Sequence, residues 1–261
     1  MKYGFIGCGN MGGAVARALS CATKDFMVSD RSGKARSLAD ELQVSYGTAQ
    51  QVAQECGRLF LCVKPQMMAA VLLPLQDILK EKKPLLITMA AGLTMEQIAA
   101  FAGAELPVIR IMPNTPVAVG KGMFPYCANA LVAPDMLEEF LADMAFAGCL
   151  DAIDEKLMDA ASALSGCGPA YMYMFLEALA DGAVACGVPR DKAISYAAAT
   201  MAGAAEMVLE GKGHPGQLKD AVCSPGGSTI EGVKALEQGG FRGVVMDGIA
   251  AAFEKTKKLG K

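Results

Sequence analysis

The stretch of glycines at the start of the chain constrains the fold more than any other part of the sequence. Residues 4–13 are GFIGCGNMGG, and Gly7, Gly9 and Gly12 fit the pattern G-x-G-x-x-G between a short apolar run and an alanine-rich segment. In such a turn the first glycine makes the bend from strand to helix, the second lets the backbone approach a pyrophosphate, and the third lets the helix pack on the strand. The motif predicts a dinucleotide site. A purely structural glycine turn in another α/β protein is the alternative.

Short apolar runs alternate with helix-like segments from this turn to about residue 112. We expect strands at 25–29, 44–46, 59–63, 85–89 and 108–112, and helices at 34–42, 49–55, 66–79 and from residue 95. The third of these runs is apolar throughout, as expected of a central parallel strand that is buried on both faces. A strand near 123–126, a helix at 134–146 and a strand at 148–150 complete this region. The alternation predicts a doubly wound parallel sheet.

The composition changes near residue 155, and the rest of the chain is predicted to be almost wholly helical. Breaks rich in glycine and proline separate its long, alanine-rich segments. We therefore expect an α/β protein with two domains. Residues 1–152 would form a Rossmann-like dinucleotide-binding domain, and residues 153–261 an all-helical domain.

Charge and cysteine content argue against several classes of protein. The formal net charge is −3, whereas a nucleic-acid-binding surface usually carries a basic patch, so no nucleic-acid partner is expected. No uncharged apolar run is long enough for a membrane helix, so no membrane association is expected. The 9 cysteines form no C-x-x-C pair, which favours free thiols in a reducing cytoplasm over disulfides or a zinc site.

The segment Asp30-Arg31-Ser32, at the end of the second predicted strand, bears on the choice of cofactor. An acidic residue at this place in a Rossmann fold binds the ribose 2′-hydroxyl of NAD, whereas an arginine beside a hydroxyl suits the 2′-phosphate of NADP. The two signals conflict, and Arg31 with Ser32 favours NADP. The alternative is a plain turn in which Ser32 caps the following helix.

A second glycine-rich turn, Ser224–Thr229, lies between two predicted helices. Its proline, two glycines and two hydroxyl residues expose backbone amides at a helix N-terminus, and such a turn binds a small anion such as a carboxylate. The alternative is an ordinary helix–helix turn in which Ser228 or Thr229 is the N-cap. The two interpretations are compatible, because a capped N-terminus still presents amides to a ligand.

Few other side chains suggest chemistry. The single histidine, His214, precedes a proline at a predicted helix start and is expected to be structural. Glu177 and Asp181 share one face of a predicted helix, but no histidine lies near them in sequence, so a polar helix face is expected and not a metal site.

Motifs along nearly the whole chain resemble those of one enzyme family. They are Gly4–Gly12 (GFIGCGNMG), Val63–Pro65 (VKP), Ala90–Gly92 (AAG), Met112–Pro116 (MPNTP), Ser165–Tyr171 (SGCGPAY), Glu177–Asp181 (EALAD) and His214–Thr229 (HPGQLKDAVCSPGGST). In this order and spacing the chain resembles the pyrroline-5-carboxylate reductases, and the last stretch is the signature region of that family. Cys167 stands where the family more often has serine or glycine, and Ser228 stands at a variable position. Neither departure touches the expected chemistry.

The resemblance implies reduction of 1-pyrroline-5-carboxylate to L-proline, the last step of proline biosynthesis, by hydride transfer from NADPH or NADH. NADPH is the expected preferred donor. The resemblance also implies a helical domain that interleaves with that of a second chain in a homodimer, with a decamer of five dimers as a further assembly. A cyclic imine is already electrophilic, so its reduction needs positioning more than acid–base groups.

The resemblance also implies roles for individual residues. Thr229 is the expected catalytic residue, because its hydroxyl would hydrogen-bond the ring nitrogen and relay a proton. The substrate carboxylate is expected on the backbone amides of Gly226, Gly227, Ser228 and Thr229. Ala90, Ala91, Asn114 and Thr115 would flank the nicotinamide and its ribose. The expected cofactor-binding residues are Ile6, Gly7, Cys8, Gly9, Asn10, Met11, Gly12, Arg31, Ser32, Cys62, Val63, Lys64, Pro65, Met89, Ala90, Ala91 and Asn114.

Two rival functions belong to other classes. One is a reductase of another imine or of a 2-oxo acid, and the turn Ser224–Thr229 argues against it. The other is a non-catalytic sensor or scaffold that binds NADP, which the same intact turn disfavours. A substrate panel and an assay of NADPH oxidation distinguish these functions from the expected one.

Overall fold

The computed structural model describes residues 1–259 and divides the chain into two compact units. Unit 1 contains Met1–Pro169 together with the residues from Ala252 onward, and unit 2 contains Ala170–Ala251. The domain boundary that we predict after residue 152 rests on composition and stays a prediction.

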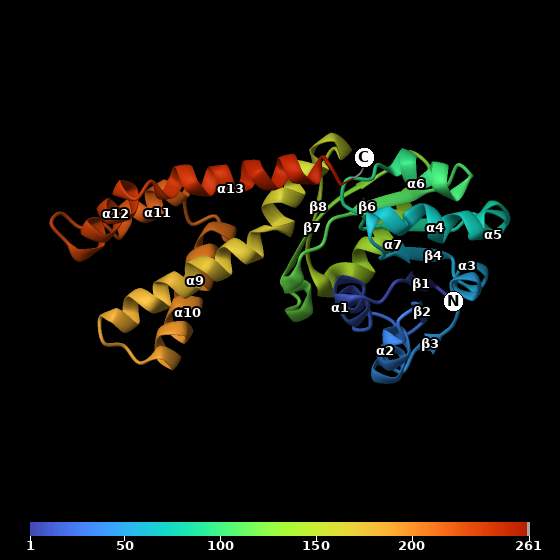
Figure 1. The fold of residues 1–261 in the computed structure, drawn as a ribbon, viewed down its shortest axis with the longest axis horizontal. Coiled ribbons are helices and arrows are strands. Elements are labelled where there is room, and N and C mark those ends of the chain that lie inside the picture. The colour runs from blue at the N-terminus through green and yellow to red at the C-terminus, as the bar shows by residue number, and fades with distance from the viewer. Residues whose placement is uncertain (260–261) are drawn as a thin grey trace. The chain divides into compact units, whose positions relative to one another are not determined.

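An eight-stranded sheet forms the centre of unit 1 (Figure 1), in the order β3-β2-β1-β4-β5-β6-β7-β8. The strands are β1 Tyr3–Ile6, β2 Phe26–Ser29, β3 Ser45–Tyr46, β4 Arg58–Leu61, β5 Leu85–Thr88, β6 Val108–Ile111, β7 Gly122–Ala128 and β8 Gly148–Ala152. Neighbours from β3 to β6 are parallel, β7 runs antiparallel to β6, and β8 is parallel to β7. The predicted α/β fold with a mostly parallel, Rossmann-like sheet is confirmed.

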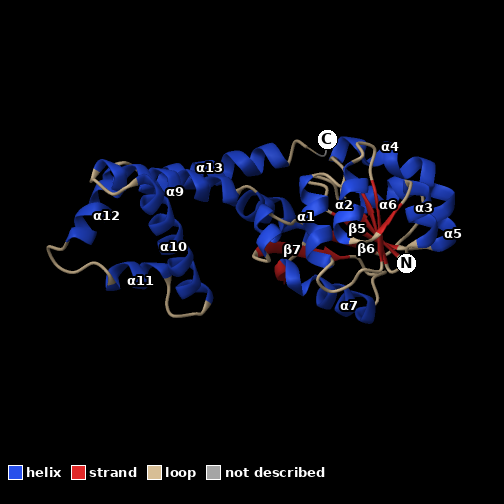
Figure 2. Cartoon of the chain, turned by 90° about the horizontal axis from the view of Figure 1, so that it is seen from below, coloured by secondary structure: helices blue, strands red, loops and turns tan. Residues whose placement is uncertain are grey.

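Helices cover both faces of this sheet (Figure 2), as the doubly wound pattern requires. One face packs on α1 Asn10–Leu19, α2 Lys34–Leu42 and α7 Pro134–Met144, and the other on α3 Ala49–Glu55, α4 Met68–Leu72, α5 Gln76–Lys82 and α6 Met95–Ala102. The first core contains stacked aromatic rings, with the centroids of Phe5 and Phe60 4.4 Å apart. The second is built mainly from leucine, valine and alanine. Because β1 to β6 are parallel, their carboxyl ends lie along one edge of the sheet.

One predicted helix in this unit is wrong, and so is the alternative role of Ser32 as a helix cap. The helix expected at 66–79 is divided into a 3₁₀ turn at Pro65–Met67, α4, a second 3₁₀ turn at Leu73–Leu75, and α5. Pro74 explains the break, because its nitrogen has no hydrogen to donate and its ring clashes with the preceding helical turn. Ser32 is not the cap of α2: Gly33 is the N-cap, in the left-handed region and without a side-chain hydrogen bond.

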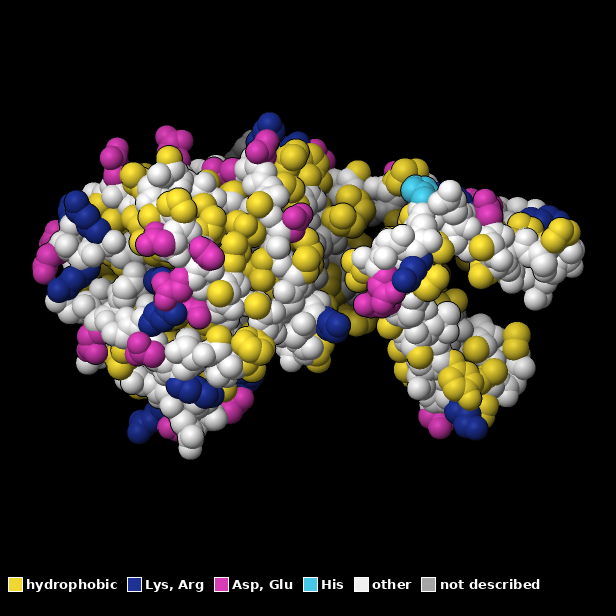
Figure 3. Space-filling view, turned by 180° about the vertical axis from the view of Figure 1, so that it is seen from behind, with side chains coloured by type: hydrophobic (Ala, Val, Ile, Leu, Met, Phe, Trp, Pro, Cys, Tyr) yellow, Lys and Arg dark blue, Asp and Glu magenta, His cyan; other side chains and the backbone are white. Residues whose placement is uncertain are grey.

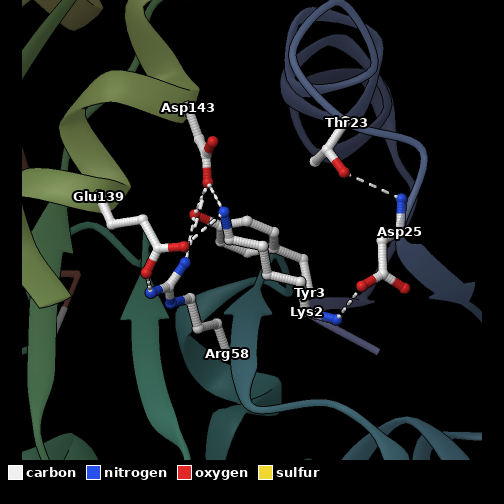
Figure 4. Close-up of polar contacts among 7 residues, drawn as sticks. All are labelled: Lys2, Tyr3, Thr23, Asp25, Arg58, Glu139 and Asp143. Carbon is white, nitrogen blue, oxygen red and sulfur yellow. Dashed lines mark hydrogen bonds and ion pairs between the residues drawn. The ribbon is translucent and has the colours of Figure 1, made fainter.

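The amino ends of the strands are closed by a polar cluster (Figure 4). The Tyr3 hydroxyl donates to Asp143 Oδ2 on α7 at 2.7 Å and accepts from Arg58 Nη1 at 3.1 Å. The Lys2 ammonium lies 2.7 Å from both Glu139 and Asp143, and Arg58 also pairs with Glu139. These contacts attach α7 to the starts of β1 and β4. They leave the opposite, carboxyl edge of the sheet for ligand binding.

The chain between the sheet and the long helices is made of short helical pieces. It forms a 3₁₀ turn at Glu155–Leu157, a short helix α8 at Met158–Ala161 and a π-helical turn at Ser162–Gly166. The helices that follow are α9 Gly168–Ala185, α10 Arg190–Leu209, α11 Pro215–Ala221, α12 Ser228–Gln238 and α13 Phe241–Thr256. No helix among residues 1–259 combines the length and the apolar character that crossing a membrane requires.

Unit 2 leaves many large hydrophobic side chains in solvent (Figure 3). The exposed fraction reaches 70% at Met174, 61% at Tyr196, 80% at Leu209 and 66% at Met246. The buried hydrophobic clusters of the described residues all lie in unit 1. Surfaces this apolar mark a site of protein association, so the helices of unit 2 require a partner surface.

Candidate active site

The predicted dinucleotide turn joins β1 to α1. Gly7 has φ = +101°, a conformation that residues with a side chain rarely adopt. A Cβ on Gly12 would lie 2.4 Å from the carbonyl oxygen of Gly7, whereas a Cβ on Gly9 would have no atom within 4 Å. Gly7 and Gly12 are therefore needed for the turn and its packing, and Gly9 keeps the space in front of the turn open.

The N-terminus of α1 fits an anionic group. Gly9 is its N-cap and makes no side-chain cap hydrogen bond, and the first turn contains no acidic residue. The first amides of a helix and the positive end of its dipole then bind a phosphate. The residues at this helix end therefore fit the pyrophosphate of a dinucleotide.

A cavity of about 570 Å³ opens at the same carboxyl edge. It brings together eight of the predicted cofactor residues: Ile6, Gly7, Cys8, Gly9, Arg31, Ser32, Val63 and Lys64. The other predicted residues do not line it: Asn10, Met11, Gly12, Cys62, Pro65, Met89, Ala90, Ala91 and Asn114. Asn10, Met11 and Gly12 belong to the first turn of α1, and Cys62 and Pro65 neighbour lining residues in the chain.

The cavity also has lining residues that we did not predict. They include Tyr46 at the end of β3 with Thr48 and Gln50 after it, and Met67, Ala70 and Val71 after β4. Their position after strand ends was a signal available in the sequence, because ligands bind at the carboxyl ends of strands in such folds. Their mostly apolar side chains provide a wall of the kind that flat organic ligands occupy.

The charged groups of the cavity favour an anionic ligand. Asp30 Oδ1 accepts from the Ser32 amide at 2.8 Å, and Asp30 Oδ2 accepts from the Ser32 hydroxyl at 3.1 Å. Both oxygens of this acid are thus used inside its own turn. Arg31 and Lys64 also line the cavity and make no ion pair within residues 1–259. Two unpaired cations therefore face the space in front of α1.

The thiols beside the turn are neutral. Burial, helped by the nearby Asp30 carboxylate, raises the pKa of Cys8 to about 12. Burial also raises the pKa of Cys62 well above its ordinary value. Protonated thiols add no negative charge next to a phosphate-binding turn.

Two further predicted segments follow β5 and β6. Ala90 is buried and its amide donates to Thr88 Oγ1 at 3.3 Å, in a turn that Gly92 completes at φ = +75°. Asn114 is also buried, and both ends of its side-chain amide are hydrogen-bonded within the protein. These segments lie at the carboxyl ends of their strands, as predicted.

The turn Ser224–Thr229 lies in unit 2. Gly226 has φ = +68°, and the Gly227 amide donates to the carbonyl of Ser224 at 3.0 Å. Gly227 is the N-cap of α12 and makes no side-chain cap hydrogen bond, so the interpretation of Ser228 or Thr229 as the N-cap is wrong. The first amides of α12, including those of Ser228 and Thr229, are thereby left for an anion.

The remaining polar candidates have structural contacts. His214 Nδ1 accepts from the Gly216 amide at 3.1 Å and caps α11, which agrees with a structural histidine. Asp181 pairs with Arg190 on the next helix. Within the described part of the chain, no three His, Cys, Asp or Glu side chains are grouped as a metal site requires.

Comparison of the sequence with protein families gives two matches. Residues 155–259 match the family described as pyrroline-5-carboxylate reductase dimerisation. Residues 2–92 match the family described as NADP oxidoreductase, coenzyme F420-dependent. The pyrroline-5-carboxylate reductase of Escherichia coli is 41% identical over 266 residues, covering 100% of this chain and 98% of the relative.

Solved structures of similar proteins agree with these matches. The pyrroline carboxylate reductase of Plasmodium falciparum, solved with NADP bound, superposes with a TM-score of 0.88 at 33% identity, covering 100% of this chain and 98% of that one. The 1-pyrroline-5-carboxylate reductase of Streptococcus pyogenes gives a TM-score of 0.90 at 32% identity, covering 99% and 98%. The likeness therefore extends over both units.

Proposed function

The chain belongs to the pyrroline-5-carboxylate reductase family, and we propose how its two glycine-rich turns serve the reaction of that family. The enzyme reduces 1-pyrroline-5-carboxylate to L-proline with NAD(P)H, the last step of proline biosynthesis. The observation that carries the proposal is the uncapped N-terminus of α1, which opens on a cavity lined by the unpaired cations Arg31 and Lys64.

NADP is the cofactor, and in its reduced form it supplies the hydride. Gly7, Gly9 and the first amides of α1 would hold its pyrophosphate. Arg31 and Ser32 would hold the 2′-phosphate, which makes NADPH the preferred donor over NADH. We include in the cofactor site the rest of the predicted set: Ile6, Cys8, Asn10, Met11, Gly12, Cys62, Val63, Lys64, Pro65, Met89, Ala90, Ala91 and Asn114.

The turn at the start of α12 would hold the substrate. The predicted set Gly226, Gly227, Ser228 and Thr229 would bind its carboxylate, with Gly226, Ser228 and Thr229 as the amide donors, because the Gly227 amide is already bonded to Ser224 and shapes the turn. Reduction of a C=N bond places a hydride on carbon and requires a proton on nitrogen. The Thr229 hydroxyl would hydrogen-bond that nitrogen and relay the proton.

The protein self-associates through its helical part, in agreement with the matched dimerisation family. We propose a homodimer in which residues 153–261 interleave, and a decamer of five dimers as the larger assembly. The exposed hydrophobic side chains of unit 2 support the first step, and the family resemblance supports the second. Light scattering coupled to size-exclusion chromatography measures which assembly forms.

We also propose that the protein acts in the cytoplasm. All 9 cysteines are free thiols, and free thiols persist in a reducing compartment. Fractionation of the source cells with a cytoplasmic marker enzyme tests this location.

One assay tests the proposed function directly. The purified chain is mixed with NADPH and 1-pyrroline-5-carboxylate, and both the loss of NADPH absorbance and the formation of proline are measured. We expect the amount of NADPH oxidised to equal the amount of proline formed. A chain that oxidises NADPH with other cyclic imines or with 2-oxo acids, and not with this substrate, would contradict the proposal. A chain that binds NADPH without oxidising it would point to a sensor.

A further inference from the structure

The side chain of Asn114 joins segments that are far apart in sequence. It follows β6 and is buried, with an exposed fraction of 8%. Its Nδ2 donates to the Ser165 carbonyl at 2.9 Å, and its Oδ1 accepts from the Met123 amide on β7 at 2.9 Å. One amide thus connects the end of β6, the start of β7 and the π-helical turn Ser162–Gly166.

The bond to Ser165 satisfies a carbonyl that an ordinary helix would leave without a donor. In an α-helix the carbonyl of Ser165 would accept from the amide of residue 169. That residue is Pro169, which has no N–H. Ser165 is partly buried, and a carbonyl that is shielded from water and has no donor costs free energy. Asn114 Nδ2 donates in place of the N–H that Pro169 lacks, which explains the contact between Asn114 and Ser165.

A second set of contacts fixes the same region. Arg110 on β6 is 2% exposed, and its Nη2 donates to Asp159 Oδ1 at 2.7 Å. Its Nη1 lies 3.5 Å from Glu155 Oε1, and the same oxygen accepts from the Met95 amide at 2.7 Å. A buried guanidinium is tolerated only when carboxylates pair with it. Glu155 is therefore held against Met95 at the start of α6, three residues after Gly92.

We propose that the Asn114 side chain is a positioning group for hydride transfer: both ends of its amide are bonded within the protein, so Asn114 belongs to the cofactor site through its backbone and not through its side chain. Its side-chain amide holds the loop 112–116 at the carboxyl edge of the sheet, while the Arg110 and Glu155 contacts hold Met95 at the start of α6, the helix that follows the turn Ala90–Gly92. This inference rests on the proposed function, because it needs the nicotinamide to bind at these two segments. Hydride transfer depends steeply on geometry, so displacement of this edge lowers the rate of the chemical step.

The test compares Asn114 with Asn129, another asparagine whose side-chain amide is bonded at both ends to backbone groups. Asn114→Asp keeps the acceptor for Met123 and removes the donor to Ser165. Asn129→Asp is the matched control, since Asn129 Oδ1 accepts from the Val108 amide at 3.1 Å and Nδ2 donates to the Leu106 carbonyl at 2.9 Å, at the amino end of β6. Both variants are measured as full-length enzyme, for thermal stability, kcat and KM with 1-pyrroline-5-carboxylate, and Kd of NADPH by calorimetry without substrate.

We expect both variants to lose stability, and Asn114→Asp alone to lose kcat, by about tenfold or more, with the Kd of NADPH unchanged. A rise of about tenfold in that Kd for Asn114→Asp would show direct binding and overturn the proposal. Equal kcat values for the two variants would also overturn it. If Asn114→Asp does not fold, Asn114→Ser is judged by the same comparison. An unmutated enzyme without activity on this substrate would instead overturn the proposed function.

Discussion

Gly12 on α1 lies against Cys62, the residue after β4, so closely that a Cβ on Gly12 would be 2.8 Å from the Cβ of Cys62. The contact holds the first helix against two adjacent strands. Gly9, three residues earlier in the same motif, has open space where its side chain would be. Gly12 thus serves helix packing and Gly9 serves ligand access, and a substitution at each position tests the two purposes separately.

Gly9→Ala and Gly12→Ala should therefore fail in different ways. Gly12→Ala is expected to lose about 1–3 kcal/mol of stability, because its methyl group overpacks the contact with Gly7 and Cys62. Gly9→Ala is expected to retain the parental melting temperature and to weaken NADPH binding by about tenfold or more, since the methyl group occupies the space of the pyrophosphate. Thermal unfolding and calorimetric titration measure the two effects. Parental NADPH affinity in Gly9→Ala would contradict the proposed pyrophosphate position.

Arg31 should determine the preference for NADPH. We expect Arg31→Ala to raise the KM for NADPH by about tenfold, because a charged hydrogen bond to the 2′-phosphate contributes about 1.5–3 kcal/mol, and to leave the KM for NADH unchanged. Arg36→Ala, which removes an exposed cation from α2, is the control. A parental enzyme with higher kcat/KM for NADH would contradict the roles given to Arg31 and Ser32.

The Thr229 hydroxyl should be needed for chemistry and not for cofactor binding. Thr229→Ala is expected to lower kcat by about a hundredfold, as loss of a proton-transferring group does, while Thr229→Ser keeps much of the activity. Ser228→Ala, one residue earlier on α12, should have little effect, because only its amide is proposed to bind substrate. The measurement is the steady-state rate with saturating NADPH. A Thr229→Ala rate within a few-fold of the parent would remove Thr229 from a chemical role.

Acid should weaken the polar cluster at the amino ends of the strands. Hydrogen bonds from Arg58 and Lys2 lower the pKa of Glu139 from 4.5 to about 2. A carboxyl whose pKa is lower in the folded state stabilises the fold above its unfolded pKa, and this stabilisation is lost as the pH falls. We therefore expect the melting temperature to fall between about pH 4.5 and pH 2, and to fall less in Glu139→Gln. Glu138→Gln, on the exposed side of α7, should behave as the parent.

Thiol reactivity should follow burial. Burial raises the pKa of Cys8 to about 12 and those of Cys56 and Cys127 to about 11, so these thiols stay protonated and shielded at neutral pH. Cys21, Cys149 and Cys186 are exposed. In the native protein, iodoacetamide should modify these three exposed residues before the buried ones, as measured by peptide mass spectrometry. Early modification of Cys8 would contradict the buried environment beside the dinucleotide turn.

The sequence alone predicts the parts of this protein that depend on local rules. Gly7 and Gly12 are needed for steric reasons that a short motif expresses, and the alternation of strands and helices determines the sheet. Local rules also gave errors: Pro74 divides a helix that was expected to be continuous, and Gly33 replaces Ser32 as a cap. The contacts of Asn114 and Arg110 could not be predicted, because they join segments whose proximity only the folded chain creates. The role of Thr229 stays a prediction that comes from family resemblance.

The exposed side chains of unit 2 make the stability of this half depend on how much of the protein is present. Met174, Leu209 and Met246 are exposed in the single chain, so an association that covers them would supply part of the folding free energy. By mass action, dilution should destabilise the helical half before it affects the sheet, and the apparent melting temperature should rise with protein concentration. The concentration of the protein is therefore one of the factors that determine whether its helical half stays folded.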